Sequence, residues 1–291
     1  MPELPEVETI KAGLAKFLPG RQIIAEKHDW PRGFPNSPAD VDQFLIGAKI
    51  KTVRRRAKVL VIDLQNNYSI VVHLKMTGQL VFKSDDFRFG AGHPSDSLIG
   101  KLPDKSTRVE ITFKDGSKLF FNDQRKFGWM RLLPTLEVEN LDFFKKVGPE
   151  PLSKNFTPSE FAQRFKRRAN SNIKAALLDQ TVVAGVGNIY ADESLWSAKI
   201  HPETKVKNIT DEQFKLLYTE LRKILNLSIS MGGSTDRNYV GADGQKGSYL
   251  QFANVFRREG QACNRCGTII IKTRVAGRGT HICPVCQPKP V

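Results

Sequence analysis

The placement of the cysteines constrains the fold of one end of this chain more than any other feature. The chain has 291 residues and four cysteines, and all four lie within the last 30 residues. They form two Cys-x2-Cys pairs with 16 residues between the pairs, at Cys263, Cys266, Cys283 and Cys286. This spacing is typical of a four-cysteine zinc ribbon, in which a hairpin brings two thiolate-bearing turns to one metal ion. It predicts one structural zinc ion (Zn2+) per chain, with two disulfides or four unrelated thiols as the alternative.

The first residues of the chain carry distinctive chemical groups. If Met1 is removed, the chain begins with the secondary amine of Pro2, next to the carboxylate of Glu3. A terminal amine has an unperturbed pKa near ~8, so much of it is neutral and nucleophilic at physiological pH. Its attack on an aldehyde-level carbon gives an iminium ion, which is an electron sink for later eliminations. The residues therefore predict covalent catalysis by Pro2, and the alternative is a rigid N-terminal segment without a catalytic role.

The excess of positive charge indicates a polyanionic partner. The formal net charge is +15 and the sequence pI is about 9.7. The basic residues are clustered, with five of them in residues 51–58 and four in residues 164–168. This pattern is typical of proteins that bind a polyphosphate such as nucleic acid, and the alternative is a merely solvated basic surface.

The composition also predicts where the protein works. No apolar stretch reaches the ~18 residues that a membrane span needs. Glu3, Glu6 and Glu8 stand where a secretory signal would carry its basic region. We therefore expect a cytoplasmic protein that makes no membrane contact.

Hydrophobic periodicity predicts a sheet-rich first half that carries one N-terminal helix. Apolar residues within 7–18 follow a helical spacing, which Pro19-Gly20 ends. Runs rich in β-branched and aromatic residues predict strands at 50–64, 68–82 and 108–122. Asp115-Gly116 is a hairpin signal inside the third run. The polar residues 84–106 predict a long surface loop.

The second half of the chain has helical signals. A Gly-Pro-Glu-Pro stretch at residues 148–151 predicts a linker. Beyond it, Thr157 and Thr210 each begin a capping box and so predict helix starts. A glycine-containing turn at residues 181–188 joins two further helical segments.

Several separated motifs of the chain occur together in one known family. They are Met1-Pro-Glu-Leu-Pro-Glu-Val-Glu-Thr9, Arg55-Arg-Ala-Lys58, His73-Leu-Lys-Met-Thr-Gly78, Asp123-Gln-Arg-Lys-Phe-Gly128, Ile173-Lys174, Gly185-Val-Gly-Asn-Ile-Tyr-Ala191 and the cysteine module. Through them the whole chain resembles the formamidopyrimidine-DNA glycosylase (Fpg) branch of the Fpg/Nei family of DNA repair enzymes. The resemblance implies an α+β multidomain fold. Its expected parts are an N-terminal helix plus β-sandwich catalytic domain (1–148), a helix–two-turn–helix DNA-binding domain with a Gly-rich lesion loop (149–247), and a C-terminal four-cysteine zinc finger (248–291).

The resemblance also implies an activity. Enzymes of this branch excise oxidised purines, chiefly 8-oxoguanine and formamidopyrimidines, from damaged double-stranded DNA in base excision repair. They are bifunctional DNA glycosylases and AP lyases that then cut the strand by β,δ-elimination. Pro2 would form the Schiff base, and Glu3 would be the general acid. Lys58 and Arg278 match the residues assigned to β- and δ-elimination, and both can equally serve as phosphate clamps. We expect the enzyme to act as a monomer.

Further matches predict DNA contacts. The residues that match the family's void-filling trio are Met76, Arg125 and Phe127. They would occupy the space that a flipped base leaves, and ordinary core packing is the alternative role of Met76 and Phe127. The residues that match phosphate contacts are His73, Lys174 and Asn188. Tyr249 ends the Gly-rich segment 241–249, which matches the loop that closes over the extruded purine.

Two other functions are compatible with parts of the sequence. The Nei branch prefers oxidised pyrimidines, but Met76 with Phe127 and the segment 241–249 favour the Fpg branch. A non-catalytic DNA- or RNA-binding protein with a zinc ribbon fits the charge and the cysteines, yet it does not need the Pro2-Glu3 pair. Borohydride trapping separates the classes, because only a lyase forms a reducible covalent adduct with DNA.

Overall fold

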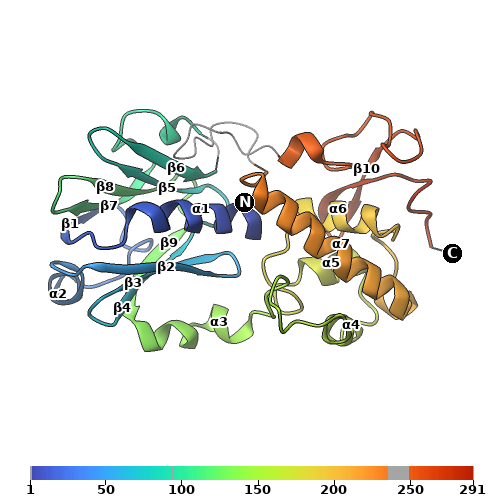
Figure 1. Ribbon diagram of the computed structural model, residues 1–291, viewed down its shortest axis with the longest axis horizontal. Helices are drawn as coiled ribbons and strands as arrows, with labels where there is room; N and C mark the ends of the chain where they lie inside the picture. The colour runs from blue at the N-terminus through green and yellow to red at the C-terminus, as the bar shows by residue number, and fades with distance from the viewer. Residues whose placement is uncertain (1, 94, 235–248, 291) are drawn as a thin grey trace. The chain divides into compact units, whose positions relative to one another are not determined.

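The computed structural model describes residues 2–93, 95–234 and 249–290 of the chain (Figure 1). The chain forms two compact units. One comprises Met1–Lys145 with Gly232–Ser248, and the other comprises Lys146–Met231 with Tyr249–Val291. The α+β fold class is confirmed, because helices, β-sheets and a four-cysteine cluster are all present. The expected three-part boundaries at 148 and 247 stay a prediction.

The expected N-terminal helix is confirmed as α1 (Leu4–Phe17). Pro5 lies in its first turn, where the missing N–H is tolerated because the first amides of a helix have no intrahelical acceptor. The apolar residues that the helix buries are Leu4, Val7, Ile10 and Leu14. Gly20 has a φ of +85°, a value that suits glycine and lets the chain turn after the helix.

Two antiparallel sheets form the body of the first unit. The five-stranded sheet has, in spatial order, β1 (Ile23–His28), β7 (Thr107–Phe113), β8 (Lys118–Asp123), β5 (Gly78–Lys83) and β6 (Arg88–Gly92). The four-stranded sheet has, in spatial order, β2 (Ile50–Arg56), β3 (Val59–Leu64), β4 (Tyr68–His73) and β9 (Trp129–Pro134). Helix α1 contacts strands of both sheets (Figure 1).

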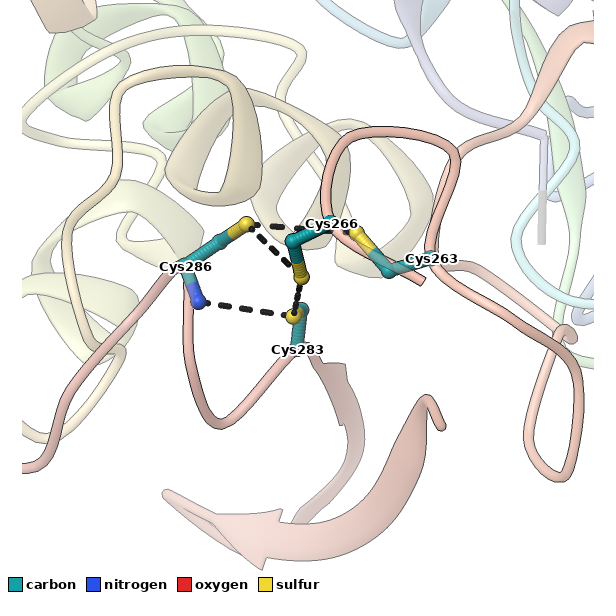
Figure 2. Close-up of side chains that lie close together, drawn as sticks. All are labelled: Cys263, Cys266, Cys283 and Cys286. Atoms are coloured by element: carbon teal, nitrogen blue, oxygen red, sulfur yellow. Dashed lines mark hydrogen bonds between the residues drawn. The ribbon is translucent and has the colours of Figure 1, made fainter. Parts of the chain in front are cut away.

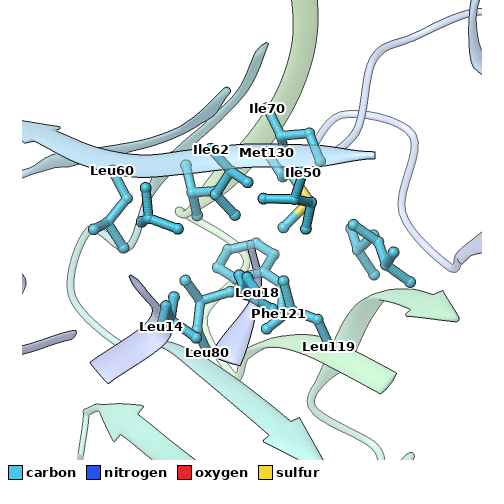
Figure 3. Packing of buried hydrophobic residues seen from close by; sticks show 14 of the residues in the cluster. Leu14, Leu18, Ile50, Leu60, Ile62, Ile70, Leu80, Leu119, Phe121 and Met130 are labelled. Carbon is cyan, nitrogen blue, oxygen red and sulfur yellow. The ribbon is translucent and has the colours of Figure 1, made fainter. Parts of the chain in front are cut away.

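The core of this unit is made by side chains from α1 and both sheets (Figure 3). Residues labelled there are Leu14, Leu18, Ile50, Leu60, Ile62, Ile70, Leu80, Leu119, Phe121 and Met130. Each fully buried aliphatic or aromatic side chain contributes roughly 1.5–3 kcal/mol of transfer free energy. This packed core therefore holds the strand ends, and the turns that join them, in fixed positions.

One sequence-based expectation for this unit is wrong. Residues 84–106 are not a continuous loop, because β6 (Arg88–Gly92) pairs with β5 inside that range and the short helix η2 (Asp96–Leu98) follows. The strand reads Arg-Phe-Gly-Ala-Gly, and its two glycines give it little strand propensity. Pairing with β5, rather than local preference, makes it a strand. The hairpin at Asp115-Gly116 is confirmed, since it joins β7 to β8.

Short elements complete the first unit and lead into the second. They are α2 (Pro38–Asp40), η1 (Val41–Leu45), η3 (Thr135–Asn140) and α3 (Asp142–Lys146).

The second unit is helical and ends in a small hairpin. Its elements are α4 (Pro158–Lys166), α5 (Ile173–Leu178), α6 (Asn188–Ser197), η4 (Val206–Asn208), α7 (Asp211–Ser230), η5 (Tyr249–Phe252), β10 (Ile271–Val275) and β11 (Arg278–Ile282). The expected capping box at Thr210 and Gln213 begins α7, and Thr157 caps α4. Among the described residues, no helix is long and apolar enough to cross a membrane.

Candidate functional site

The Pro2-Glu3 pair lies buried at the start of α1. A carboxylate that the sequence analysis did not single out, Glu6, holds this segment: its Oε2 accepts the backbone N–H of Glu3 at 2.8 Å. Its Oε1 accepts the N–H of Ser234, also at 2.8 Å. Glu6 therefore fixes the backbone next to Pro2 and the residues that precede the segment 235–248. The signal for it was a Glu three residues after Glu3, which is the spacing of a capping box.

Lys58 lies in the turn between β2 and β3 of the four-stranded sheet, and His73 ends the neighbouring strand β4. Ala57 has a φ of +53° in the tight turn that carries Lys58 between β2 and β3. His73 pairs with Val59 across β3 and β4, and only 6% of it is exposed. Burial first, and then the positive charges of Lys75 and Lys58, lower the pKa of His73 to about 3.

His73 is therefore neutral at physiological pH. Its Nδ1 accepts the backbone N–H of Lys75 at 3.1 Å, which leaves the ring proton on Nε2. A neutral Nε2–H can donate a hydrogen bond to a phosphate without adding a charge. The predicted phosphate contact of His73 is compatible with this arrangement and stays a prediction.

We expect His73 to weaken the protein in mild acid. The pKa of His73 is about 3 in the native protein, below the ordinary value of 6.5. As the pH falls from 6.5 towards 3, the unfolded chain therefore binds a proton at His73 that the native chain does not bind, and the native state loses stability. Between pH 7.5 and 4.5 this loss of stability is about 2–3 kcal/mol by linkage. A His73→Gln variant should show a flatter acid limb in urea unfolding curves. An identical pH dependence in both proteins would contradict the assignment.

The expected void-filling trio is brought together by the structure. Met76 follows Lys75, whose φ is +49°, in the turn after β4. Arg125 and Phe127 lie in the turn between β8 and β9. The Arg125 Nη1 lies 3.2 Å from Met76 Sδ, and its guanidinium carbon lies 4.7 Å from the centroid of the Phe127 ring. Met76 and Phe127 are 40% and 53% exposed, so ordinary core packing does not account for them.

A buried carboxylate, Asp123, joins the two turns that carry the trio. It is 0% exposed, and its Oδ1 accepts the hydroxyl of Thr77 and the N–H of Arg125. Its Oδ2 accepts the N–H of Gly128 at 2.7 Å. Asp123 begins one of the matched motifs, but no pattern in the sequence indicates this structural role. Its position shows that it fixes the geometry from which Met76 and Arg125 project.

The second unit holds Lys174, Asn188 and Arg278. The Nδ2 of Asn188 and the Nζ of Lys174 both donate to the carbonyl of Gly279, at 3.0 Å and 3.2 Å. Arg278 is exposed at the start of β11, next to that carbonyl. Lys174 is 0% exposed, which argues against the direct phosphate contact expected for it.

Tyr249 is buried in the core of the second unit. Its ring lies 5.5 Å from the ring of Tyr190, centroid to centroid, and its hydroxyl lies 3.5 Å from Glu193 Oε2. The rest of the segment matched to the lesion loop, residues 241–248, lies outside the described residues. The role of Tyr249 in that loop stays a prediction.

The four cysteines form one cluster (Figure 2). Their Sγ atoms all lie within 4.8 Å of one another, and three of the separations are 3.4, 3.5 and 3.9 Å. A regular tetrahedron of thiolates about 2.3 Å from a zinc ion has edges of about 3.8 Å. A disulfide needs a separation of about 2.05 Å, so the cluster fits a metal ion and not two disulfides.

The electrostatics of the cluster also fit a cation. Burial, followed by the other three thiols, raises the pKa of Cys286 to about 12. Hydrogen bonds with Thr268 lower the pKa of Cys266 to about 6. Four thiolates in this space repel one another, and a divalent ion removes the repulsion.

Consecutive acidic residues of α6 attach the C-terminal module to the helical part of the second unit, and the sequence analysis missed both. Glu193 is 0% exposed and accepts the N–H groups of Asn254, Val255 and Phe256 at 2.8–3.1 Å. Asp192 accepts the N–H of His281 at 3.0 Å. The sequence signal for this attachment was a pair of adjacent acidic residues in the middle of an otherwise uncharged helical segment.

Comparisons with known proteins agree along the whole chain. Three family models match: the formamidopyrimidine-DNA glycosylase N-terminal domain over residues 1–130, the formamidopyrimidine-DNA glycosylase H2TH domain over residues 147–239, and a zinc finger found in FPG and IleRS over residues 260–289. The formamidopyrimidine-DNA glycosylase of Chloroflexus aurantiacus is 40% identical over 288 residues, which cover 99% of this chain and 98% of that protein.

Solved structures of Lactococcus lactis Fpg are also similar. A mutant in complex with Fapy-dG containing DNA has a TM-score of 0.87 and 35% identity, and the match covers 99% of this chain and 100% of that one. The complex between the same organism's Fpg and an abasic site containing DNA has a TM-score of 0.86, with 35% identity and the same coverage. Together with the family models and the relative at 40% identity, these matches show that the chain belongs to the formamidopyrimidine-DNA glycosylase family of DNA repair enzymes.

Proposed function

We propose that this protein is a bifunctional DNA glycosylase and AP lyase that excises 8-oxoguanine and formamidopyrimidines from double-stranded DNA. The observation that carries the proposal is the buried Pro2-Glu3 pair, whose backbone Glu6 holds at the start of α1. A protein that only binds DNA needs neither an N-terminal amine nor a carboxylate fixed beside it. The Lactococcus relatives with bound Fapy-dG and abasic-site DNA support the choice of substrate.

The chemistry begins once the damaged nucleotide leaves the base stack, which costs a few kcal/mol of unstacking. Met76 and Phe127 fill the vacated space as apolar wedges, and Arg125 presents paired donors to the orphaned cytosine. Their mutual contacts support this division of labour, because the cation over the Phe127 ring stiffens both side chains.

The Pro2 nitrogen then attacks C1′, forming an N–C1′ bond as the bond from C1′ to the damaged base breaks. Glu3 protonates the sugar ring oxygen as the ring opens, and an iminium ion results. The iminium makes the C2′ proton acidic, and loss of that proton expels the 3′ phosphate by β-elimination. The conjugated iminium that results makes the C4′ proton acidic in turn, and loss of that proton expels the 5′ phosphate by δ-elimination. Lys58 assists the first elimination and Arg278 the second.

The residues proposed to contact DNA phosphates are His73 in the first unit and Asn188 and Arg278 in the second. The buried Oδ1 of Asn188 has no hydrogen-bond partner, so this side chain has a further polar atom to satisfy. We expect the enzyme to act as a monomer in the bacterial cytoplasm, and Tyr249 to anchor the end of the lesion loop.

The test is a cleavage assay on a duplex with one 8-oxoguanine·cytosine pair, run without added nucleotide or catalytic metal and then repeated with borohydride. We expect strand cleavage with phosphate at both new ends, and a covalent protein–DNA adduct in the reduced reaction. Cleavage of an oxidised pyrimidine in preference to 8-oxoguanine would favour the Nei branch. Binding without cleavage or adduct would show a non-catalytic protein.

We also propose that Cys263, Cys266, Cys283 and Cys286 bind one structural zinc ion. Four thiolates complete a tetrahedral shell and leave no position for a reactive water molecule. The ion would hold the module against Trp196, which packs with the buried Cys263 and Cys283.

Loss of the metal should therefore impair DNA binding before it impairs the first unit. We expect elemental analysis to find one zinc ion per chain. A Cys283→Ser variant should lose the ion and bind DNA more weakly, because the β10–β11 hairpin loses its support. Near-ultraviolet spectra of the first unit's tryptophans should persist. Absence of metal together with two titrated disulfides would contradict the assignment.

A further inference from the structure

Lys174 and Asp192 form an ion pair inside the second unit. The Lys174 Nζ lies 2.6 Å from Asp192 Oδ1, and both side chains are 0% exposed. A buried ion pair is weak evidence for stability, because desolvation of both charges offsets their attraction. Its best-attested use is to specify one arrangement of the parts that it joins. Here the pair joins α5 and α6 to strand β11.

The pair holds three consecutive residues of strand β11. Besides Asp192, the Lys174 Nζ donates to Thr280 Oγ1 at 2.7 Å and to the Gly279 carbonyl at 3.2 Å. The other carboxylate oxygen of Asp192 accepts the backbone N–H of His281 at 3.0 Å. An ammonium can donate three hydrogen bonds, and these three acceptors lie within hydrogen-bond distance of Lys174 Nζ. One residue of α5 and one of α6 thus bind residues 279–281.

These three residues directly follow Arg278. Ala276 and Gly277 have φ values of +51° and +72° in the two-residue turn between β10 and β11, and Val275 pairs with Arg278 across it. The backbone of Arg278 therefore lies between a tight turn and residues that the ion pair holds. Its own side chain is exposed. This fixed backbone limits the positions that the Arg278 guanidinium can reach.

We propose that the Lys174–Asp192 pair is the positioning device for Arg278, and that Lys174 acts on DNA through the β10–β11 turn rather than by touching a phosphate. The proposal rests on the proposed function, since it needs Arg278 to act on a DNA phosphate. It explains why a lysine in a DNA-binding motif is fully buried. It also gives Asp192 a role in strand cleavage, although it lies out of reach of solvent.

Salt dependence of DNA binding distinguishes a positioning lysine from a phosphate contact. Arg278→Ala should reduce the slope of log affinity against log salt by about one unit, because one cationic contact is lost. Lys174→Met alone should also reduce the slope, because Arg278 loses its position, so the informative comparison is made in the Arg278→Ala background. There, adding Lys174→Met should leave the slope within experimental error of that of Arg278→Ala alone. A further reduction of about one unit in the double variant would overturn the proposal, since it would show that Lys174 itself neutralises a phosphate.

A double-mutant cycle tests whether the two residues act as a unit. On DNA with a preformed abasic site, Lys174→Met and Asp192→Asn should each shift the products from β,δ towards β alone, as Arg278→Ala does. The double variant should lose no more δ-elimination product than the more impaired of the two single variants. It also removes the uncompensated charge that destabilises each single variant, so it keeps the test valid if one of them folds poorly. A loss of δ-elimination product in the double variant that equals the sum of the two single losses would overturn the proposal.

Lys199→Met is the matched control, because Lys199 is an exposed lysine of the same unit. The Lys199→Met variant has one positive charge fewer, and its ratio of β- to β,δ-elimination products should equal that of the wild-type protein. Zinc content should stay at one ion per chain in every variant used. If wild-type protein fails to cleave 8-oxoguanine DNA, the proposed function is wrong. If wild-type protein cleaves and Lys174→Met gives the same products as Lys199→Met, only the positioning role is wrong.

Discussion

Replacing Pro2 by glycine should remove most of the covalent adduct that borohydride traps between this protein and 8-oxoguanine DNA. A secondary amine forms an iminium ion directly, whereas glycine offers a primary amine with a different backbone preference. Loss of the secondary amine, and of the ring that fixes its position, impairs the bond-forming step itself, so we expect adduct formation to fall by roughly 100-fold or more. The measurement is the yield of reduced adduct on a denaturing gel under single-turnover conditions.

The same experiment has two internal comparisons. A chain that retains Met1 has an amide at Pro2 and should form no adduct, although its binding to DNA should be near normal. Pro19→Gly changes an exposed proline just beyond α1 and should leave trapping unchanged. Full trapping by the chain that retains Met1 would exclude Pro2 as the nucleophile.

Glu3→Gln should separate base excision from the later steps. Glutamine has nearly the same shape but cannot transfer the proton, and general acid catalysis typically contributes about 10²–10⁴-fold. We therefore expect excision of 8-oxoguanine to slow by a factor in that range, measured by single-turnover kinetics. The backbone N–H of Glu3, which Glu6 accepts, is unaffected by the change. DNA affinity and its salt slope should match the wild-type values.

The Glu3→Gln protein should still nick a preformed abasic site, because there the base is already gone. Glu8→Gln is the control on the same helix, since Glu8 pairs with Lys11 and Arg55 on a different face of α1 from the buried Glu6. Excision by Glu3→Gln at close to the wild-type rate would show that another group supplies the proton.

Local patterns in the sequence predicted several parts of the structure. The spacing of the cysteines predicted the metal-binding cluster, and the apolar period of residues 7–18 predicted α1. Thr210 and Gln213 predicted the start of α7. These features depend on groups a few residues apart, because a knuckle, a helical turn and a cap are each closed by neighbouring residues. Pattern and structure agree where the interaction is local.

Family resemblance identified residues whose arrangement needed the fold. Met76 and Arg125 are 49 positions apart in sequence, yet one guanidinium contacts the thioether because Asp123 ties the two turns together. No periodicity of either segment indicates that contact. The strand β6 was missed for a related reason, since its glycines have little strand propensity and only its partner β5 makes it a strand.

The sequence by itself thus predicted the class of fold and the four-cysteine cluster, and it indicated Pro2 and Glu3 as the candidates for covalent catalysis. Only the tertiary structure shows that Lys174 is buried and which groups it contacts. A lysine in a basic DNA-binding chain is expected at the surface, where its charge is solvated or meets a phosphate. Here Asp192, 18 positions away, and Thr280, 106 positions away, surround its ammonium in the interior. Burial of a charge depends on partners that only the folded chain assembles, so the sequence pattern could not reveal it.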